Sequence, residues 1–102
     1  MTNPKNINQI INFQEGSVVS KEIISKPMGT ITLFAFDKGQ SLSEHTAPYD
    51  ALVIITEGVA KILVSNIKYE VKAGEMLLMP ANAPHALKAV QPFKMILIMI
   101  KS

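Results

Sequence analysis

The chain contains two histidines, His45 and His85, and no cysteine. Imidazole serves near neutral pH as a metal ligand, a hydrogen-bonding group or a general base. The lack of cysteine excludes disulfides, thiolate metal ligands and a cysteine nucleophile. No Ser-His-Asp order and no glycine-rich dinucleotide or phosphate motif is present either. The two histidines are therefore the residues around which a functional site is expected.

The segments that must position these histidines are short and rich in β-forming residues. Turn signals recur every eight to twelve residues, a spacing typical of β-sandwiches and β-barrels. No segment of helical length carries an apolar stripe. The sequence predicts an all-β single domain over residues 1–102, with residues 1 to about 10 as a loose arm. Strands are expected at 18–25, 29–36, 42–47, 51–56, 60–64, 68–72, 75–79, 84–90 and 93–100.

Both histidines lie in glycine-bounded motifs. Gly39 is followed by five residues and then His45, and Gly74 is followed by five residues, Pro80 and later His85. This pattern, over residues 39–58 and 74–89, resembles the two sequence motifs of the cupin superfamily. The resemblance implies a single cupin domain, a jelly-roll barrel or double-stranded β-helix with a pocket in its interior.

The resemblance is incomplete at the positions that bind metal. In metal-binding cupins the ligands are two histidines and a glutamate of the first motif and the histidine of the second. His45 and His85 occupy two of these positions, whereas Ala47 and Ala51 occupy the other histidine position and the glutamate position. Two imidazoles alone seldom hold a catalytic metal. Asp50 is a candidate third ligand, and the metal would be Zn, Ni, Fe, Mn or Cu, among which imidazole does not choose.

Three functions follow from this pattern. Ala47 and Ala51 remove bulk as well as ligands, and they predict a roomy, apolar pocket that also contains His45, His85 and Leu87. The favoured function is the binding of a small molecule, and of a divalent metal where a third ligand is present. One alternative is a metal-dependent enzyme of the isomerase, dioxygenase or decarboxylase type. The other is a structural domain in which both histidines are hydrogen-bonded core residues.

Charge and hydropathy limit the partners. The formal net charge is +2, and all ten basic residues are lysines that occur singly along the sequence, with no arginine. This pattern argues against nucleic-acid binding and is typical of a solubilising surface. The longest apolar run, residues 95–100, is too short to span a bilayer. The first residues lack the apolar core of a signal peptide, so a cytoplasmic location is expected.

Two expected strands, residues 51–55 and 95–100, are apolar on both faces. A strand of an antiparallel sheet normally has one polar face in contact with water. A second apolar face therefore needs a cover, and a second copy of the chain in a homodimer is the economical one. The alternative is that residues 1–28 fold back over this face.

Overall fold

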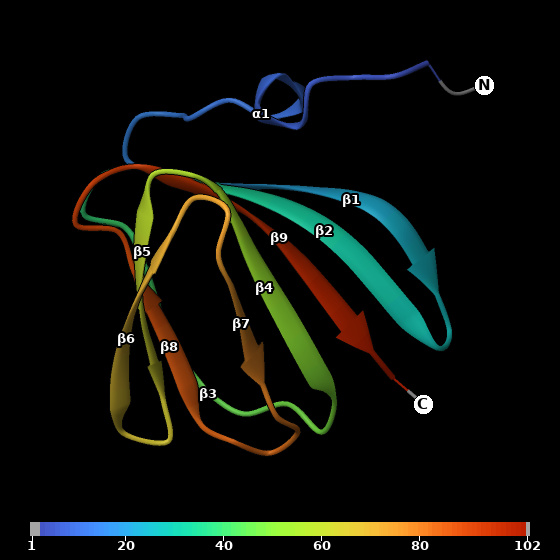
Figure 1. Cartoon of the computed structure of the whole chain (residues 1–102), viewed down its shortest axis with the longest axis vertical. Coiled ribbons are helices and arrows are strands. Elements are labelled where there is room, and N and C mark those ends of the chain that lie inside the picture. The colour runs from blue at the N-terminus through green and yellow to red at the C-terminus, as the bar shows by residue number, and fades with distance from the viewer. Residues whose placement is uncertain (1–2, 102) are drawn as a thin grey trace.

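The computed structural model describes residues 3–101, which form two antiparallel sheets packed face to face (Figure 1). One sheet has the strand order β1-β2-β9-β4-β7 and the other has the order β3-β8-β5-β6. Successive strands from β2 to β5 and from β6 to β9 pass between the sheets, which confirms the jelly-roll barrel. The elements are α1 (Ile7–Ile10), β1 (Val18–Lys26), β2 (Gly29–Phe36), β3 (Ser41–His45), β4 (Asp50–Glu57), β5 (Val59–Val64), β6 (Ile67–Lys72), β7 (Met76–Met79), β8 (His85–Lys88) and β9 (Phe93–Ile100).

Strands bounded by strong turn signals agree with the prediction, and those beside prolines are shorter. Strands β2 and β9 have the predicted limits. Strand β3 ends at His45 instead of Ala47, because the carbonyl of Ala47 accepts a hydrogen bond from the backbone of Asn82 at 2.8 Å. In the described part of the chain, no helix is long and apolar enough to cross a membrane.

Turn chemistry fixes the order of the strands. The predicted β5–β6 hairpin is confirmed, and its central residues Ser65 and Asn66 have φ of 49° and 68°. Such positive values match the right-handed twist of the paired strands. Between β4 and β5, Gly58 has φ of +78°, and an added Cβ would lie 2.5 Å from the carbonyl oxygen of Pro92. Only glycine fits this close approach.

The main core lies between the two sheets. Its centre is the stacked pair Phe36 and Phe93, whose ring centroids are 4.5 Å apart, with both side chains fully buried. Alternate residues of each strand point into this core, as the two-residue period of a strand requires. The cluster comprises Phe36, Ala51, Val53, Ile55, Ala60, Ile62, Val64, Val71, Met79, Leu87, Ala89, Phe93 and Met95.

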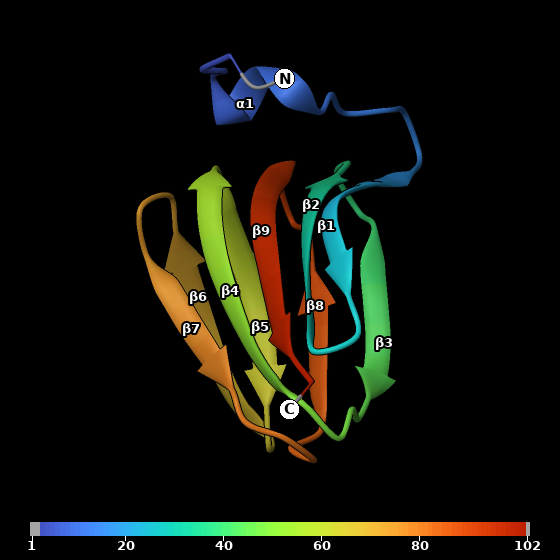
Figure 2. The ribbon, with the colours of Figure 1, turned by 90° about the vertical axis from the view of Figure 1, so that its right-hand side faces the viewer.

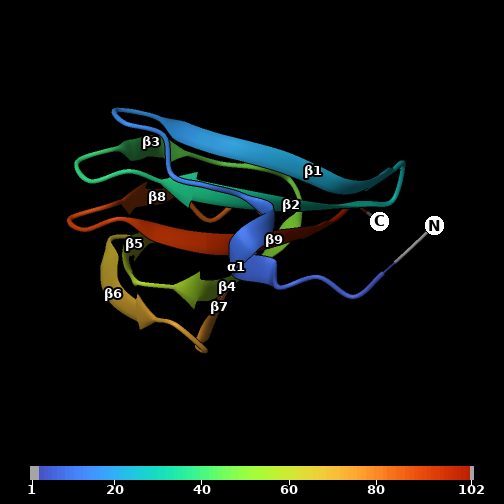
Figure 3. The same cartoon turned by 90° about the horizontal axis from the view of Figure 1, so that it is seen from above.

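The N-terminal segment covers part of the outer face of the five-stranded sheet. Ile11 is buried in a second cluster with Leu33 and Ala35 of β2, and Ile7 and Phe13 pack against the same cluster. Figures 2 and 3 show α1 at one end of the barrel. For residues 7–10 this differs from the loose arm expected for residues 1 to 10, of which residues 1 and 2 lie outside the described part of the chain. The apolar positions of this segment explain the difference, since they bury surface against the sheet.

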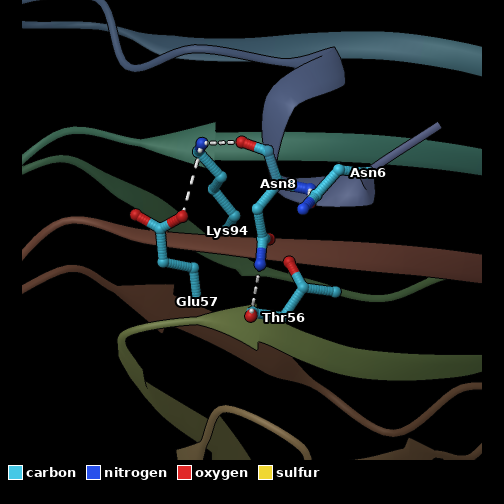
Figure 4. Close-up of polar contacts among 5 residues, drawn as sticks. All are labelled: Asn6, Asn8, Thr56, Glu57 and Lys94. Carbon is cyan, nitrogen blue, oxygen red and sulfur yellow. Dashed lines mark hydrogen bonds and ion pairs between the residues drawn. The ribbon is translucent and has the colours of Figure 1, made fainter.

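Polar contacts fasten this segment to the sheet around Lys94 of β9 (Figure 4). The Lys94 side chain is only 8% exposed; its Nζ donates to the carbonyl oxygen of Asn8 and lies 3.4 Å from Oε1 of Glu57. The same Nζ lies 4.9 Å from the ring centroid of Phe13. Asn8 Nδ2 also donates to the carbonyl oxygen of Thr56 at 3.1 Å. We call these five residues the Lys94 cluster.

Candidate functional site

His45 ends β3 and His85 begins β8, and the two residues are direct partners across these antiparallel strands. Their ring centroids are 4.2 Å apart and the ring planes meet at 66°, an edge-to-face arrangement. The register shifts between Leu42 and His45, so residues 43 and 44 together oppose Ala86. This bulge lets His45 share the inward face with Leu42, although three positions separate them.

Each imidazole makes the same local hydrogen bond. His45 Nδ1 lies 2.9 Å from the carbonyl oxygen of Ser43, and His85 Nδ1 lies 3.0 Å from that of Ala83. A carbonyl oxygen only accepts, so Nδ1 carries the proton in each neutral ring and Nε2 presents a lone pair. The two hydrogen bonds therefore orient both rings and leave the Nε2 of each as an acceptor, in rings whose centroids are 4.2 Å apart.

One histidine of the pair is buried and the other is exposed. His85 is 7% exposed, whereas His45 belongs to the exposed residues. The buried side-chain atom without a hydrogen-bond partner, among residues 3–101, is Asn8 Oδ1 and not a histidine nitrogen. The free Nε2 of His85 is therefore not sealed inside the protein, and a ligand can approach the pair from outside.

The other predicted pocket residues are only partly brought together. Ala51 and Leu87 are both buried in the core between the sheets. Ala51 is paired with Met79 on one side and Met99 on the other, so thioether side chains surround the position where metal-binding cupins have glutamate. Ala47 is half-buried in the loop after β3.

Asp50 does not join the histidines. Its Oδ1 accepts a hydrogen bond from the backbone of Ala81 at 2.9 Å, and the residue is exposed. Residues 3–101 contain no group of three His, Cys, Asp or Glu side chains that could hold a metal ion. Asp50 as third ligand is thus a prediction that this geometry does not favour. Two imidazoles without a carboxylate do not fit the four-ligand site of metal-binding cupins.

A groove of about 680 Å³ lies elsewhere, on the outer face of the four-stranded sheet. Of the predicted pocket residues it includes Leu87 but neither histidine. Its charged residues are Lys61, Lys68, Lys88 and Glu70. This grouping could not be predicted from the sequence, because lysines that occur singly along the chain become neighbours only through the strand register. The alternation of Lys61 and Lys88 with buried residues is the signal that each faces outward.

Known proteins agree with the architecture. The family model of the cupin domain matches residues 32–101 of the chain. No curated protein matches it. A conserved protein of unknown function from Streptococcus pyogenes is similar over 100% of this chain and 90% of its own, with 33% identity and a TM-score of 0.95.

Two further solved structures share the fold. A cupin 2 conserved barrel domain protein from Leptotrichia buccalis is 42% identical, with a TM-score of 0.88, over 91% of this chain and 45% of its own. A cupin superfamily protein from Desulfitobacterium hafniense is 28% identical, with a TM-score of 0.95, over 100% of this chain and 94% of its own. The similarity therefore extends to the N-terminal segment that lies before the matched domain.

Proposed function

We propose that this protein, which belongs to the cupin domain family, binds a small organic molecule through the Nε2 atoms of His45 and His85. The observation that carries the proposal is that each Nδ1 is held by a backbone carbonyl, which leaves each Nε2 without a partner within residues 3–101. A few fixed polar groups beside apolar surface are the usual form of a small-molecule site, and the two oriented acceptors at this end of the barrel have that form.

The chemistry of the pair defines the ligand. Two neighbouring acceptors complement a molecule with two hydrogen-bond donors, such as a diol or an amino alcohol. Leu42 and Leu87 are partners on the same two strands. Leu87 is buried in the core, and the half-buried Leu42 presents apolar surface next to the histidines. The favoured ligand is therefore a small molecule with a polar end on the histidines and an apolar body against the barrel.

Substitution by asparagine tests this proposal. An asparagine side chain keeps an N–H donor near the position of Nδ1 but has no group at the position of Nε2. A library of small diols, amino alcohols and hydroxyaromatic compounds would be screened by ligand-observed NMR against the wild type, His45→Asn and His85→Asn. Binders lost in both variants would support the proposal. Absence of binders, or binders indifferent to both substitutions, would overturn it.

A divalent metal is the alternative occupant of the same two atoms. Its remaining ligands would have to come from water or from a bound molecule, because the chain supplies only two imidazoles. Elemental analysis of untagged protein, beside the two asparagine variants, decides between the occupants. Near-stoichiometric metal that is lost in both variants would favour the metal-dependent enzyme. Metal-free protein after incubation with Zn, Ni, Mn and Fe(II) would leave the organic ligand.

We also propose that the protein is a homodimer. One row of outward-facing residues crosses all five strands of the larger sheet, and every member is apolar: Ile24, Ile31, Ile98, Leu52 and Leu78. The N-terminal segment packs on Leu33 and Ala35, not on this row, whose ends Ile24 and Leu78 remain 45% and 57% exposed. A continuous apolar strip of this kind marks an association surface.

A second copy of the chain complements this row, since a two-fold axis brings the same patch of each subunit together. Light scattering after gel filtration should give a dimer for the wild type and a monomer for Leu78→Lys. Ile67→Lys is the matched control, because Ile67 is 55% exposed on the other sheet. A monomeric wild type, or a Leu78→Lys variant that remains dimeric, would contradict this assignment.

A further inference from the structure

Three lysines, two from the β5–β6 hairpin and one from β8, lie on the outer face of the four-stranded sheet. Lys61 of β5 is directly opposite Lys88 of β8. Lys68 of β6 is opposite Leu63, the next outward-facing residue after Lys61. Opposed residues of antiparallel strands have Cβ atoms about 5 Å apart, so the ammonium groups of Lys61 and Lys88 can reach a single ligand group.

Short side chains on β3 and β8, next to Lys88, help to form the groove. Ser41, Ser43 and Ala86 lie among its lining residues, and they leave the sheet open between the longer side chains of the lysines and Leu63. Its volume of about 680 Å³ is that of a site for a small organic molecule. The groove is thus apolar at Leu63 and Ala86 and cationic at its walls.

The charges of the groove are not balanced within it. Lys61, Lys68 and Lys88 face one acidic lining residue, Glu70, which gives a net charge of +2. This equals the formal net charge of the whole chain, so the lysines and acidic residues elsewhere are equal in number. Glu70 is opposite Lys61, but the ion pair found within residues 3–101 is Lys94–Glu57. Like charges directly opposite one another are destabilising. An anion bound between Lys61 and Lys88 would remove this repulsion.

We propose that this groove is a second binding site, separate from the histidine pair, for a small molecule that carries a phosphate group. A phosphate monoester has a charge of about −1.5 to −2 at pH 7, so one such group neutralises Lys61 and Lys88 together. A single carboxylate neutralises only one of them. Lysine binds phosphate as a point charge and needs no arginine fork. The hydroxyl groups of Ser41 and Ser43 supply further donors, and Leu63 and Ala86 contact the apolar part of the molecule.

Phenyl phosphate and benzoate form a matched pair of probes, because they share a ring and differ in charge. Each would be titrated into ¹⁵N-labelled protein at low ionic strength, where surface charges are least screened. Phenyl phosphate should shift the amides of residues 41–43, 61–63, 68–70 and 86–88 and bind about tenfold more tightly than benzoate. Lys61→Gln and Lys88→Gln should each weaken phenyl phosphate about threefold to tenfold.

Two controls separate this site from the others. Lys21→Gln removes an exposed lysine of the other sheet and should leave the affinity unchanged. The double variant with His45→Asn and His85→Asn should also bind phenyl phosphate as the wild type does, so the groove and the histidine pair can fail independently. The proposal is overturned if no amide shifts saturate, if the shifts gather at the histidines, or if Lys21→Gln weakens binding as much as Lys61→Gln.

Discussion

The two ends of the barrel each hold a buried polar side chain, and these side chains differ in how fully they are satisfied. Lys94, 6% exposed, has a carbonyl oxygen, a carboxylate and an aromatic ring around its ammonium group. His85 is 7% exposed, and its Nδ1 is hydrogen-bonded to the carbonyl oxygen of Ala83. Its Nε2 has no hydrogen-bond partner within residues 3–101, and its ring packs against that of His45. Lys94 and His85 are therefore similarly buried, but the polar group of Lys94 is fully paired and that of His85 is only half paired.

This difference separates a structural role from a binding role. A buried charge that is fully paired fixes the elements that surround it, and its loss lowers stability. A fixed ring with a free acceptor contributes little more to folding than its one bond, but it is ready to bind a partner. We therefore expect changes at the Lys94 cluster to alter unfolding free energy and changes at the histidines to alter ligand affinity.

The largest expected effect on stability is that of Lys94→Ala. It removes the group that joins Asn8 to Glu57 and leaves a void beneath Phe13. The free energy of unfolding should fall by about 2–3 kcal/mol, measured by urea denaturation. Binding at the histidines should be unchanged under native conditions. A variant with wild-type stability would show that the N-terminal segment is not fastened at this residue.

His45→Asn and His85→Asn should give the reverse result. Each keeps a donor for its backbone carbonyl, so the free energy of unfolding should stay within about 1 kcal/mol of the wild type. Affinity for a ligand found in the NMR screen should fall at least about tenfold, which corresponds to about 1.4 kcal/mol. Isothermal titration measures the affinity. A strong loss of stability with unchanged affinity would make both histidines structural residues.

Phe13→Leu tests the aromatic contact of Lys94 with little change in apolar volume. The ring lies 4.9 Å from Nζ, and a cation–π contact of this kind contributes about 0.5–1 kcal/mol. We expect a decrease in unfolding free energy of that size. In the Lys94→Met background the same substitution should cost less, and an equal cost in both backgrounds would exclude the interaction.

Asn8→Ala should have the smallest effect. It removes the hydrogen bond from Nδ2 to Thr56, but it also removes Oδ1, which is buried without a partner. These changes oppose one another, so the net change should be below about 0.5 kcal/mol by the same denaturation. A loss above about 2 kcal/mol would mean that the side chain of Asn8, and not its carbonyl, fastens the segment.

The sequence was sufficient where local signals act alone. Glycine and proline mark the ends of β2 and β9. The two glycine-bounded motifs predicted that His45 and His85 lie together, and the two rings are neighbours. Asn82 has φ of 67°, in the left-handed region that asparagine tolerates better than most residues.

The rest depends on which strands become neighbours. The pairing of Lys61 with Lys88 joins strands that are separated by β6 and β7 in sequence, so spacing could not reveal it. The packing of residues 7–13 on the outer face of β2 agrees in part with the alternative that residues 1–28 fold back, but the sequence could not say which strand the segment covers. The hydrogen bond from Ala81 to Asp50 likewise depends on a contact between the loop after β7 and the first residue of β4.

The position of the proton in each imidazole ring, on Nδ1 or on Nε2, tests the central claim most directly. Long-range ¹H–¹⁵N spectra of the histidine rings would be recorded at about pH 8.5, where an ordinary imidazole is neutral. We expect both His45 and His85 to carry the proton on Nδ1 and to have an unprotonated Nε2. A proton on Nε2 of either ring would contradict the account, because that ring would then offer a donor where the proposed ligand needs an acceptor.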